Sequence, residues 1–199
     1  MFIELTEFLR CPAAHPSDPH LVLVPDQMVG RMVLEGTVGC PQCRQEFPVR
    51  GGVADFDANA APASPAPPAD QRLADTVRAL LALTNPGGYV VLVGSAAALA
   101  PALTSLMGGI HLVGVNPPAG VQVGANLSLL RHGAGLPLRS RMARGVVLGA
   151  EATAAWLEEG ARVLLGGLRL VVLRPEVTPP GAVQQMASGH GLWVGEKRP

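Results

Sequence analysis

Two short segments carry four side chains of the kinds that bind metal ions, and they constrain the fold of the N-terminal part of the chain more than any other feature. Cys40 and Cys43 form a C-x2-C pair, and Cys11 and His15 form a C-x3-H pair. A C-x2-C pair on a tight turn presents two thiolates on one side of the backbone, as a tetrahedral zinc ion requires. Four such ligands leave no open coordination position. The spacing therefore predicts a structural zinc site and not a catalytic one.

Other interpretations of these residues stay open at the level of the sequence. Three cysteines are an odd number for a disulfide framework, and free cysteines are often buried as small apolar residues. His20 is an alternative fourth ligand, although the spacing of His15 is more usual for zinc sites. A thioredoxin-like redox role for the C-x2-C pair lacks the expected strand-then-helix context. We expect zinc, with His15 as the fourth ligand.

Residues 58–69 consist mostly of alanine and proline and divide the chain. Such a segment cannot form a core of its own and is typical of an extended, semi-rigid linker. In a chain of 199 residues we therefore predict a first domain over 1–57, a linker over 58–69 and a second domain over 70–199. The first holds eight acidic residues against four arginines, and the rest holds eleven basic residues against seven acidic ones. This opposite charge favours docking of the two domains.

The C-x2-C pair lies within a longer motif. Residues 39–56 read GCPQCRQEFPVRGGVADF, and residues 9–12 read LRCP. Together they resemble the short zinc-ribbon family that includes the activator subunit of tRNA and translation-factor methyltransferases. That family reads roughly L-x-C-P-x-C, then C-x-x-C-x-x-x-Y-P-I-x-D-G-I-P, and Ala14, Phe47 and Gly51 depart from it. The resemblance implies a small zinc-ribbon-like β domain over residues 3–56.

Apolar runs alternate with amphipathic segments in the rest of the chain, as in repeated right-handed βαβ units. Short β-rich runs predict strands at 89–93, 110–115, 145–148, 168–173 and, as a last antiparallel edge strand, 192–195. Helical periodicity and capping residues predict helices at about 70–83, 96–107 and 151–162. The predicted fold class is α/β, with a small zinc-ribbon-like β domain followed by a reduced Rossmann-like αβα domain.

The order of these elements resembles the class I S-adenosylmethionine-dependent methyltransferases over roughly residues 71–198. The first strand and turn of that family usually read V-L-D-x-G-x-G-x-G, and residues 91–98 read VLVGSAAA here. The family's glycine positions fall on Gly94, Ala96 and Ala98, and the acid at the end of the second strand is replaced by Asn116. If the cofactor binds, the resemblance places it against these residues.

Several groups that the family uses at this site are replaced. Glycine lets the backbone approach a cofactor, whereas Ala96 and Ala98 carry methyl groups. Asn116 offers a neutral amide where an acid would hold the ribose. Residues 136–144 read LPLRSRMAR where the family has L-P-F-x-D-x-S-F-D, so both aspartates are absent. We therefore expect a pseudo-methyltransferase that does not bind S-adenosylmethionine and has no catalytic residues.

No aspartate, glutamate, lysine or arginine occurs between Arg78 and Arg131. A surface helix normally has a charged outer face, and the segment Ala96–Met107 has none. Residues 89–115 are long enough for a transmembrane span, but the proline and paired glycines within them argue against one. We expect this face to be covered by a protein partner, because soluble monomers rarely expose a large apolar surface.

The other polar residues give weaker indications. Neutral net charge and few aromatic residues argue against a nucleic-acid partner. The histidines at 111, 132 and 190 have no neighbouring ligand spacing and are expected to be structural or to face solvent. Four arginines could contact an anion, although a solvated loop is the commoner outcome: Arg131, Arg139, Arg141 and Arg144.

Together these features predict a non-catalytic scaffold subunit that binds and stabilises a larger protein assembly through Ala96–Met107 and the linker. The start of the chain lacks a basic segment followed by a long apolar run, so the expected compartment is the cytoplasm. One version of this prediction is a peripheral subunit on the cytoplasmic side of a membrane complex. The alternative function is an S-adenosylmethionine-dependent methyltransferase with a divergent cofactor site.

Overall fold

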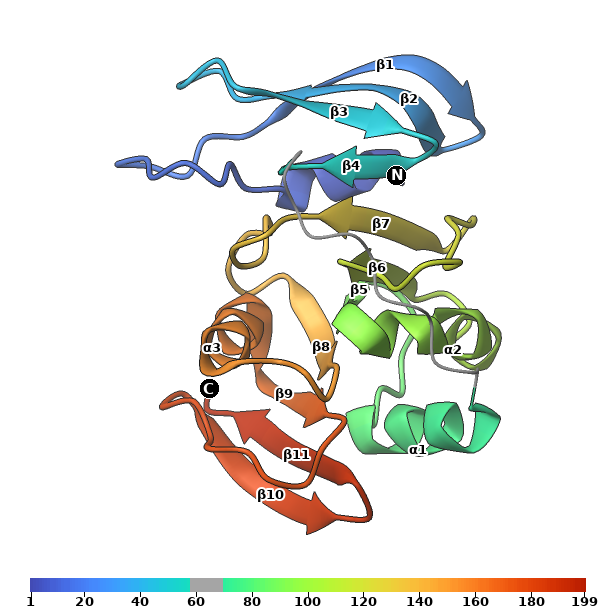
Figure 1. Ribbon diagram of the computed structural model, residues 1–199, viewed down its shortest axis with the longest axis vertical. Coiled ribbons are helices and arrows are strands. Elements are labelled where there is room, and N and C mark those ends of the chain that lie inside the picture. The colour runs from blue at the N-terminus through green and yellow to red at the C-terminus, as the bar shows by residue number, and fades with distance from the viewer. Residues whose placement is uncertain (58–69) are drawn as a thin grey trace.

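The computed structural model describes residues 1–57 and 70–199, so the predicted linker lies outside the described residues. The described strands form one 11-stranded sheet in the order β1-β2-β3-β4-β7-β6-β5-β8-β9-β11-β10. Figure 1 shows this sheet extending along the molecule, with helices on both faces of its C-terminal part. The fold class is α/β, as the sequence predicts.

The N-terminal part is an antiparallel meander of four strands, preceded by a 3-10 helix. Its elements are η1 Ile3–Phe8, β1 Val22–Val29, β2 Met32–Gly39, β3 Glu46–Arg50 and β4 Val53–Asp55. Gly30, at φ +58°, makes the turn between β1 and β2 in a conformation that favours glycine. The ring centroids of Phe47 and Phe56 lie 4.8 Å apart, and both rings contribute to the core beneath β3 and β4. The small β-rich unit that the sequence predicts is therefore present.

Five parallel strands form the C-terminal part of the sheet. They are β5 Tyr89–Val93, β6 His111–Val115, β7 Leu127–Arg131, β8 Ala143–Leu148 and β9 Leu164–Val172. Their order, β7-β6-β5-β8-β9, is the 3-2-1-4-5 order of a Rossmann-like sheet. The chain leaves β5 on one side to form β6 and later forms β8 on its other side. Such folds bind ligands outside the carboxyl ends of the two strands where the order reverses, here β5 and β8.

An antiparallel hairpin, β10 Val183–Gly189 and β11 Leu192–Lys197, completes the sheet. β11 pairs with β9 on one side and with β10 on the other. The prediction of an antiparallel strand at 192–195 is therefore confirmed, but its predicted place at the edge of the sheet is wrong. β10 forms the edge, and six of its seven residues are exposed. Its sequence consequently lacks the apolar alternation of a half-buried strand.

Helices cover both faces of the parallel strands (Figure 1). One face packs against α1 Gln71–Leu81, η2 Gly94–Leu99 and α2 Ala100–Leu106, and the other packs against η1 and α3 Ala154–Val163. Val90 and Leu92 of β5 belong to the core under α1 and α2, and Val91 and Val93 belong to the core on the α3 side. A strand buried on both faces has a continuous apolar sequence, which is why the sequence predicts β5 well.

Backbone pairing between β4 and β7 joins the two parts of the sheet. Residues 53–55 pair in parallel with residues 129–131, and Arg10 N–H donates to the Pro137 carbonyl at 3.0 Å. Without β4, strand β7 would leave a row of unpaired backbone groups at an edge. The ion pairs found among the described residues each lie within one part. Strand pairing and shared apolar packing therefore hold the parts together, and a contribution from their opposite charge stays a prediction.

The uncharged segment Ala96–Met107 lies within η2 and α2 and is mostly buried by the chain itself. Its exposed positions are Pro101 and Ser105. The buried ones are Ala96, Ala97, Ala98, Leu99, Ala100, Leu103 and Met107. Packing within the chain therefore accounts for the missing charges, and a partner contact here stays a prediction. Within residues 1–57 and 70–199, no helix has the length and apolarity needed to cross a membrane.

Candidate metal centre and ligand-binding edge

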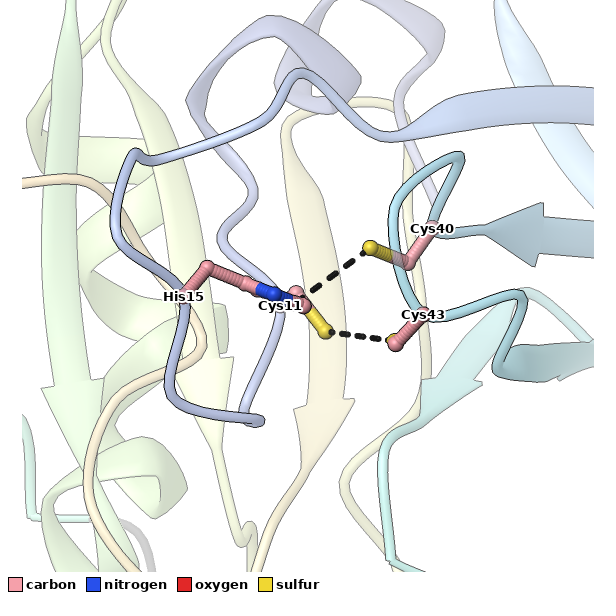
Figure 2. Close-up of side chains that lie close together, drawn as sticks. All are labelled: Cys11, His15, Cys40 and Cys43. Atoms are coloured by element: carbon pink, nitrogen blue, oxygen red, sulfur yellow. Dashed lines mark hydrogen bonds between the residues drawn. The ribbon is translucent and has the colours of Figure 1, made fainter.

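Cys11, His15, Cys40 and Cys43 converge on one point, as Figure 2 shows. Their ligand atoms, three sulfurs and one imidazole nitrogen, all lie within 4.8 Å of one another. The Sγ atoms of Cys11 and Cys43 are 3.7 Å apart, and Nε2 of His15 lies 3.5 Å from Sγ of Cys40. This cluster could hold a metal ion. The alternative ligand His20 does not belong to the cluster found among the described residues.

Cys40 and Cys43 are presented by the turn between β2 and β3. The turn is closed by two backbone hydrogen bonds of 2.9 Å, from Cys40 N–H to the Gln45 carbonyl and from Arg44 N–H to the Cys40 carbonyl. Arg44 adopts φ +61°, a left-handed conformation that is uncommon for residues other than glycine. The turn thereby points both cysteine side chains toward the segment that follows η1.

That segment places Cys11 and His15 opposite the turn. Contacts other than regular secondary structure fix it, because residues 10–21 form only bends and loops. Nε of Arg10 lies 3.0 Å from Oδ1 of Asp18, and Nη2 of Arg139 donates to the Asp18 carbonyl at 3.0 Å. Arg139, which the sequence left as a candidate anion contact, here supports the loop. The predicted ligands are thus positioned by residues from both parts of the chain.

The two buried thiols of the cluster differ in acidity. Burial raises the pKa of the Cys11 thiol to about 12. Burial also acts to raise the pKa of the Cys40 thiol, but hydrogen bonds from the backbone N–H groups of Cys43 and Gln42 outweigh it and lower that pKa below its usual value. Because metal ions bind the thiolate, metal binding here would release the Cys11 proton. Metal affinity should therefore fall as the pH is lowered.

A second group of polar atoms lies at the carboxyl ends of β5 and β8. The Glu151 carboxylate accepts hydrogen bonds from the backbone N–H of Ser95 at 2.6 Å and from Ser95 Oγ at 2.7 Å. Gly94, directly after β5, has φ +61°, and a Cβ on either Gly94 or Gly149 would clash with the Glu151 carboxylate. Both glycines therefore leave space for one carboxylate. Glu151 was not predicted from the sequence, in which its only signal is an acid just beyond the apolar run at 145–148.

The structure separates the residues that the methyltransferase resemblance assigns to a cofactor. Gly94 lies beside Glu151, whereas Ala96 and Ala98 are buried within η2, 0% and 8% exposed. Asn116 follows β6 at φ +51° and binds the backbone of His132. Its Nδ2 donates to the His132 carbonyl at 2.7 Å, and its Oδ1 accepts the His132 N–H at 2.9 Å. Both ends of the Asn116 amide are thus engaged within the chain.

A cleft of about 560 Å³ opens beside the same edge of the sheet. Its walls come from the start of α3, the segment 174–180, and two residues of β10. Arg174 lines the cleft and also donates from Nη1 to the Ala150 carbonyl at 2.9 Å. Arg174 therefore connects the cleft with the loop that carries Glu151.

Comparison with models of known protein families gives no match, and comparison with curated proteins gives none either. Solved structures do match, and we report three. A protein of Anabaena variabilis, described as a methyltransferase from an antibiotic biosynthesis pathway, is 19% identical, with 52% of this chain and 45% of that chain covered and a TM-score of 0.44. This chain thus spans less than half the length of that relative.

The other two structures are covered more fully. A Methanococcus maripaludis protein described as an S-adenosyl-L-methionine-dependent methyltransferase is 12% identical, with 65% of this chain and 85% of that chain covered and a TM-score of 0.49. The antibiotic-resistance methyltransferase Kmr is 15% identical, with 63% of this chain and 93% of that chain covered and a TM-score of 0.46. At these identities the likeness concerns the fold alone.

These comparisons correct the function expected from the sequence. The three solved structures named above are described as methyltransferases, which contradicts the expectation of a non-catalytic scaffold subunit. They favour the alternative that the sequence left open, and they give no support to the expectation that S-adenosylmethionine does not bind. For the N-terminal part, the structure shows a Cys/His cluster that could bind a metal, and the resemblance to the zinc-ribbon activator family stays a prediction.

Proposed function

We propose that the protein is an S-adenosylmethionine-dependent methyltransferase with a divergent cofactor site at the carboxyl ends of β5 and β8. One observation carries the proposal: the strand order reverses at this edge, and Gly94, Ser95 and Glu151 meet there. A turn with positive φ and two hydrogen-bond donors that already hold a carboxylate are suited to binding a small polar ligand.

The residues present fit the polar groups of this cofactor. Ser95 has a backbone N–H and a hydroxyl that can donate to the carboxylate of the cofactor, as both now donate to the carboxylate of Glu151. When bound, S-adenosylmethionine supplies an electrophilic methyl group on sulfur. Gly94 leaves the backbone accessible, since the atom closest to its missing Cβ belongs to the end of a flexible side chain. The acceptor molecule would occupy the cleft beside α3.

Calorimetric titration of the full chain with S-adenosylhomocysteine tests this function. We expect saturable binding with a dissociation constant between about 1 µM and 1 mM, the range typical of enzyme substrates. S-Adenosylmethionine should compete for the same site. A titration with no saturable heat up to the millimolar range, on protein shown to be folded, would rule the proposal out.

We also propose that the metal is zinc and that its role is structural. With Zn–S bonds of about 2.3 Å and Zn–N bonds of about 2.0 Å, a tetrahedron separates two sulfurs by about 3.8 Å and a sulfur from a nitrogen by about 3.5 Å. The separations of 3.7 Å between Cys11 and Cys43 and 3.5 Å between Cys40 and His15 agree with this geometry. Three thiolates and one imidazole fill the coordination sphere, which is typical of a structural site.

A further inference from the structure

The Glu151 carboxylate occupies the two donors that face the ligand-binding edge. Ser95 lies at the start of η2, and both its backbone N–H and its hydroxyl point to the two oxygens of Glu151, at 2.6 and 2.7 Å. Within residues 1–57 and 70–199, the Glu151 carboxylate makes no hydrogen bond or ion pair other than these two. A paired contact of this kind is the one that a ligand carboxylate would make with the same donors.

The surroundings of this contact allow the side chain to leave while the backbone stays in place. Glu151 and Ala150 are exposed. The loop itself is fixed, because Arg174 donates to the Ala150 carbonyl at 2.9 Å and Ala152 N–H donates to the Gly149 carbonyl at 3.1 Å. Rotation of the Glu151 side chain would therefore expose the Ser95 donors without unfolding the loop.

We infer that Glu151 is an internal competitor that holds the place of the cofactor's carboxylate. This inference rests on the proposed function, and it concerns the cofactor's only anionic group. Two carboxylates cannot share the Ser95 donors, because like charges at this distance repel each other strongly. The ligand carboxylate binds to Ser95 only when Glu151 has turned away. Glu151 thus weakens binding of S-adenosylmethionine and its product, and it does not weaken binding of an adenosyl ligand that lacks a carboxylate.

The test compares two ligands in two proteins by calorimetry. S-Adenosylhomocysteine carries the carboxylate, and 5′-methylthioadenosine lacks the whole amino-acid portion. We expect Glu151→Ala to bind S-adenosylhomocysteine about tenfold more tightly than the unmodified chain does, since hydrogen bonds to a charged group are freed for the ligand. Its affinity for 5′-methylthioadenosine should change by less than about twofold. Asp75→Ala, which removes one exposed charge on α1, is the control and should leave both affinities unchanged.

Glu151→Gln provides a second variant of nearly the same shape. It keeps an acceptor for Ser95 but loses the negative charge. Its affinity for S-adenosylhomocysteine should therefore lie between that of the unmodified chain and that of Glu151→Ala. Weaker or equal binding of S-adenosylhomocysteine by both variants, with binding by the unmodified chain intact, would overturn the inference and leave the proposed function standing. Absence of binding of either ligand by all folded proteins would overturn both.

Discussion

Single side chains determine the chemistry of both candidate sites, and their partners are distant in the sequence. The Cys11–Cys43 contact spans 32 residues, and the Ser95–Glu151 contact spans 56. The metal ligands could be predicted because cysteine and histidine spacings recur at zinc sites. Glu151 could not, because one acid after a strand is common and only the folded sheet brings it to Ser95. The same holds for Asn116, whose bonds to His132 depend on β6 and β7 lying side by side.

Substitution of His15 should abolish metal binding, whereas substitution of His20, the other histidine of this segment, should not. We expect His15→Ala to lose stoichiometric zinc, because three ligands leave the site open to water and chelators. His20→Ala is the matched control and should retain one zinc ion per chain. Elemental analysis of both purified proteins measures this. Equal zinc content in the two variants would exclude His15 as a ligand.

The buried His111 should make stability depend on pH. Its Nε2 lies 2.9 Å from Ser128 Oγ, and burial, with the nearby N-terminal amine, lowers its pKa to about 4. The unfolded chain binds this proton near the ordinary pKa of about 6.5, so stability is lost as the pH falls from about 6.5 to about 4. The loss attributable to His111 should approach about 3 kcal/mol.

Chemical denaturation across that pH range checks this prediction. His111→Gln keeps a hydrogen-bonding group near Ser128 and does not titrate, so its stability should depend less on pH in this window. The Met1 amine, whose pKa burial lowers to about 5, is present in both proteins, so the difference between their pH profiles reports His111 together with its interaction with that amine. Parallel pH profiles for the two proteins would contradict the assignment to His111.

At the scale of elements, burial explains which predictions succeed. Strands β5, β6, β8 and β9 were predicted because apolar runs are typical of strands buried on both faces. The helix expected at 151–162 begins instead at Ala154, because Glu151 binds Ser95 and does not join the first turn. The helix expected at 96–107 is divided into η2 and α2, with Pro101 in the first turn of α2. β7 and β10 were not predicted.

The turn between α1 and β5 depends on one arginine. Nη1 of Arg144 lies 2.6 to 3.0 Å from the carbonyls of residues 85–87, in the turn that leads into β5. We expect Arg144→Ala to lower the free energy of unfolding by about 1–2 kcal/mol, since hydrogen bonds from a charged group are lost. The control Arg72→Ala removes an exposed side chain on α1 and should cost less than about 0.5 kcal/mol. Urea denaturation measures both, and equal losses would refute this role.

At the scale of the whole molecule, β4 makes one sheet from two parts that the sequence describes separately. The division at residues 58–69 stays a prediction, because that segment lies outside the described residues. The β4–β7 pairing could not be predicted, since nothing in a three-residue strand specifies a partner more than 70 residues away. A continuous sheet implies that stability in one part affects the other.

Removal of zinc should therefore destabilise the C-terminal part as well. Both tryptophans, Trp156 and Trp193, lie in that part, so tryptophan fluorescence reports its unfolding alone. We expect a chelator to lower the urea midpoint measured by fluorescence, because loss of the metal separates the segment after η1 from the β2–β3 turn and so weakens the N-terminal part that pairs with β7. The chelator should not shift the midpoint of His15→Ala any further. An unchanged midpoint in the unmodified protein would show that the two parts unfold independently.

A crystal structure of the full chain with saturating S-adenosylhomocysteine would show whether a cofactor binds at the carboxyl ends of β5 and β8. We predict ligand density between the turn at Gly94 and the loop at Glu151, with the ligand carboxylate on the N–H and hydroxyl of Ser95 and the Glu151 side chain turned away. A structure in which Glu151 still binds Ser95 and no ligand lies at this edge would contradict the account.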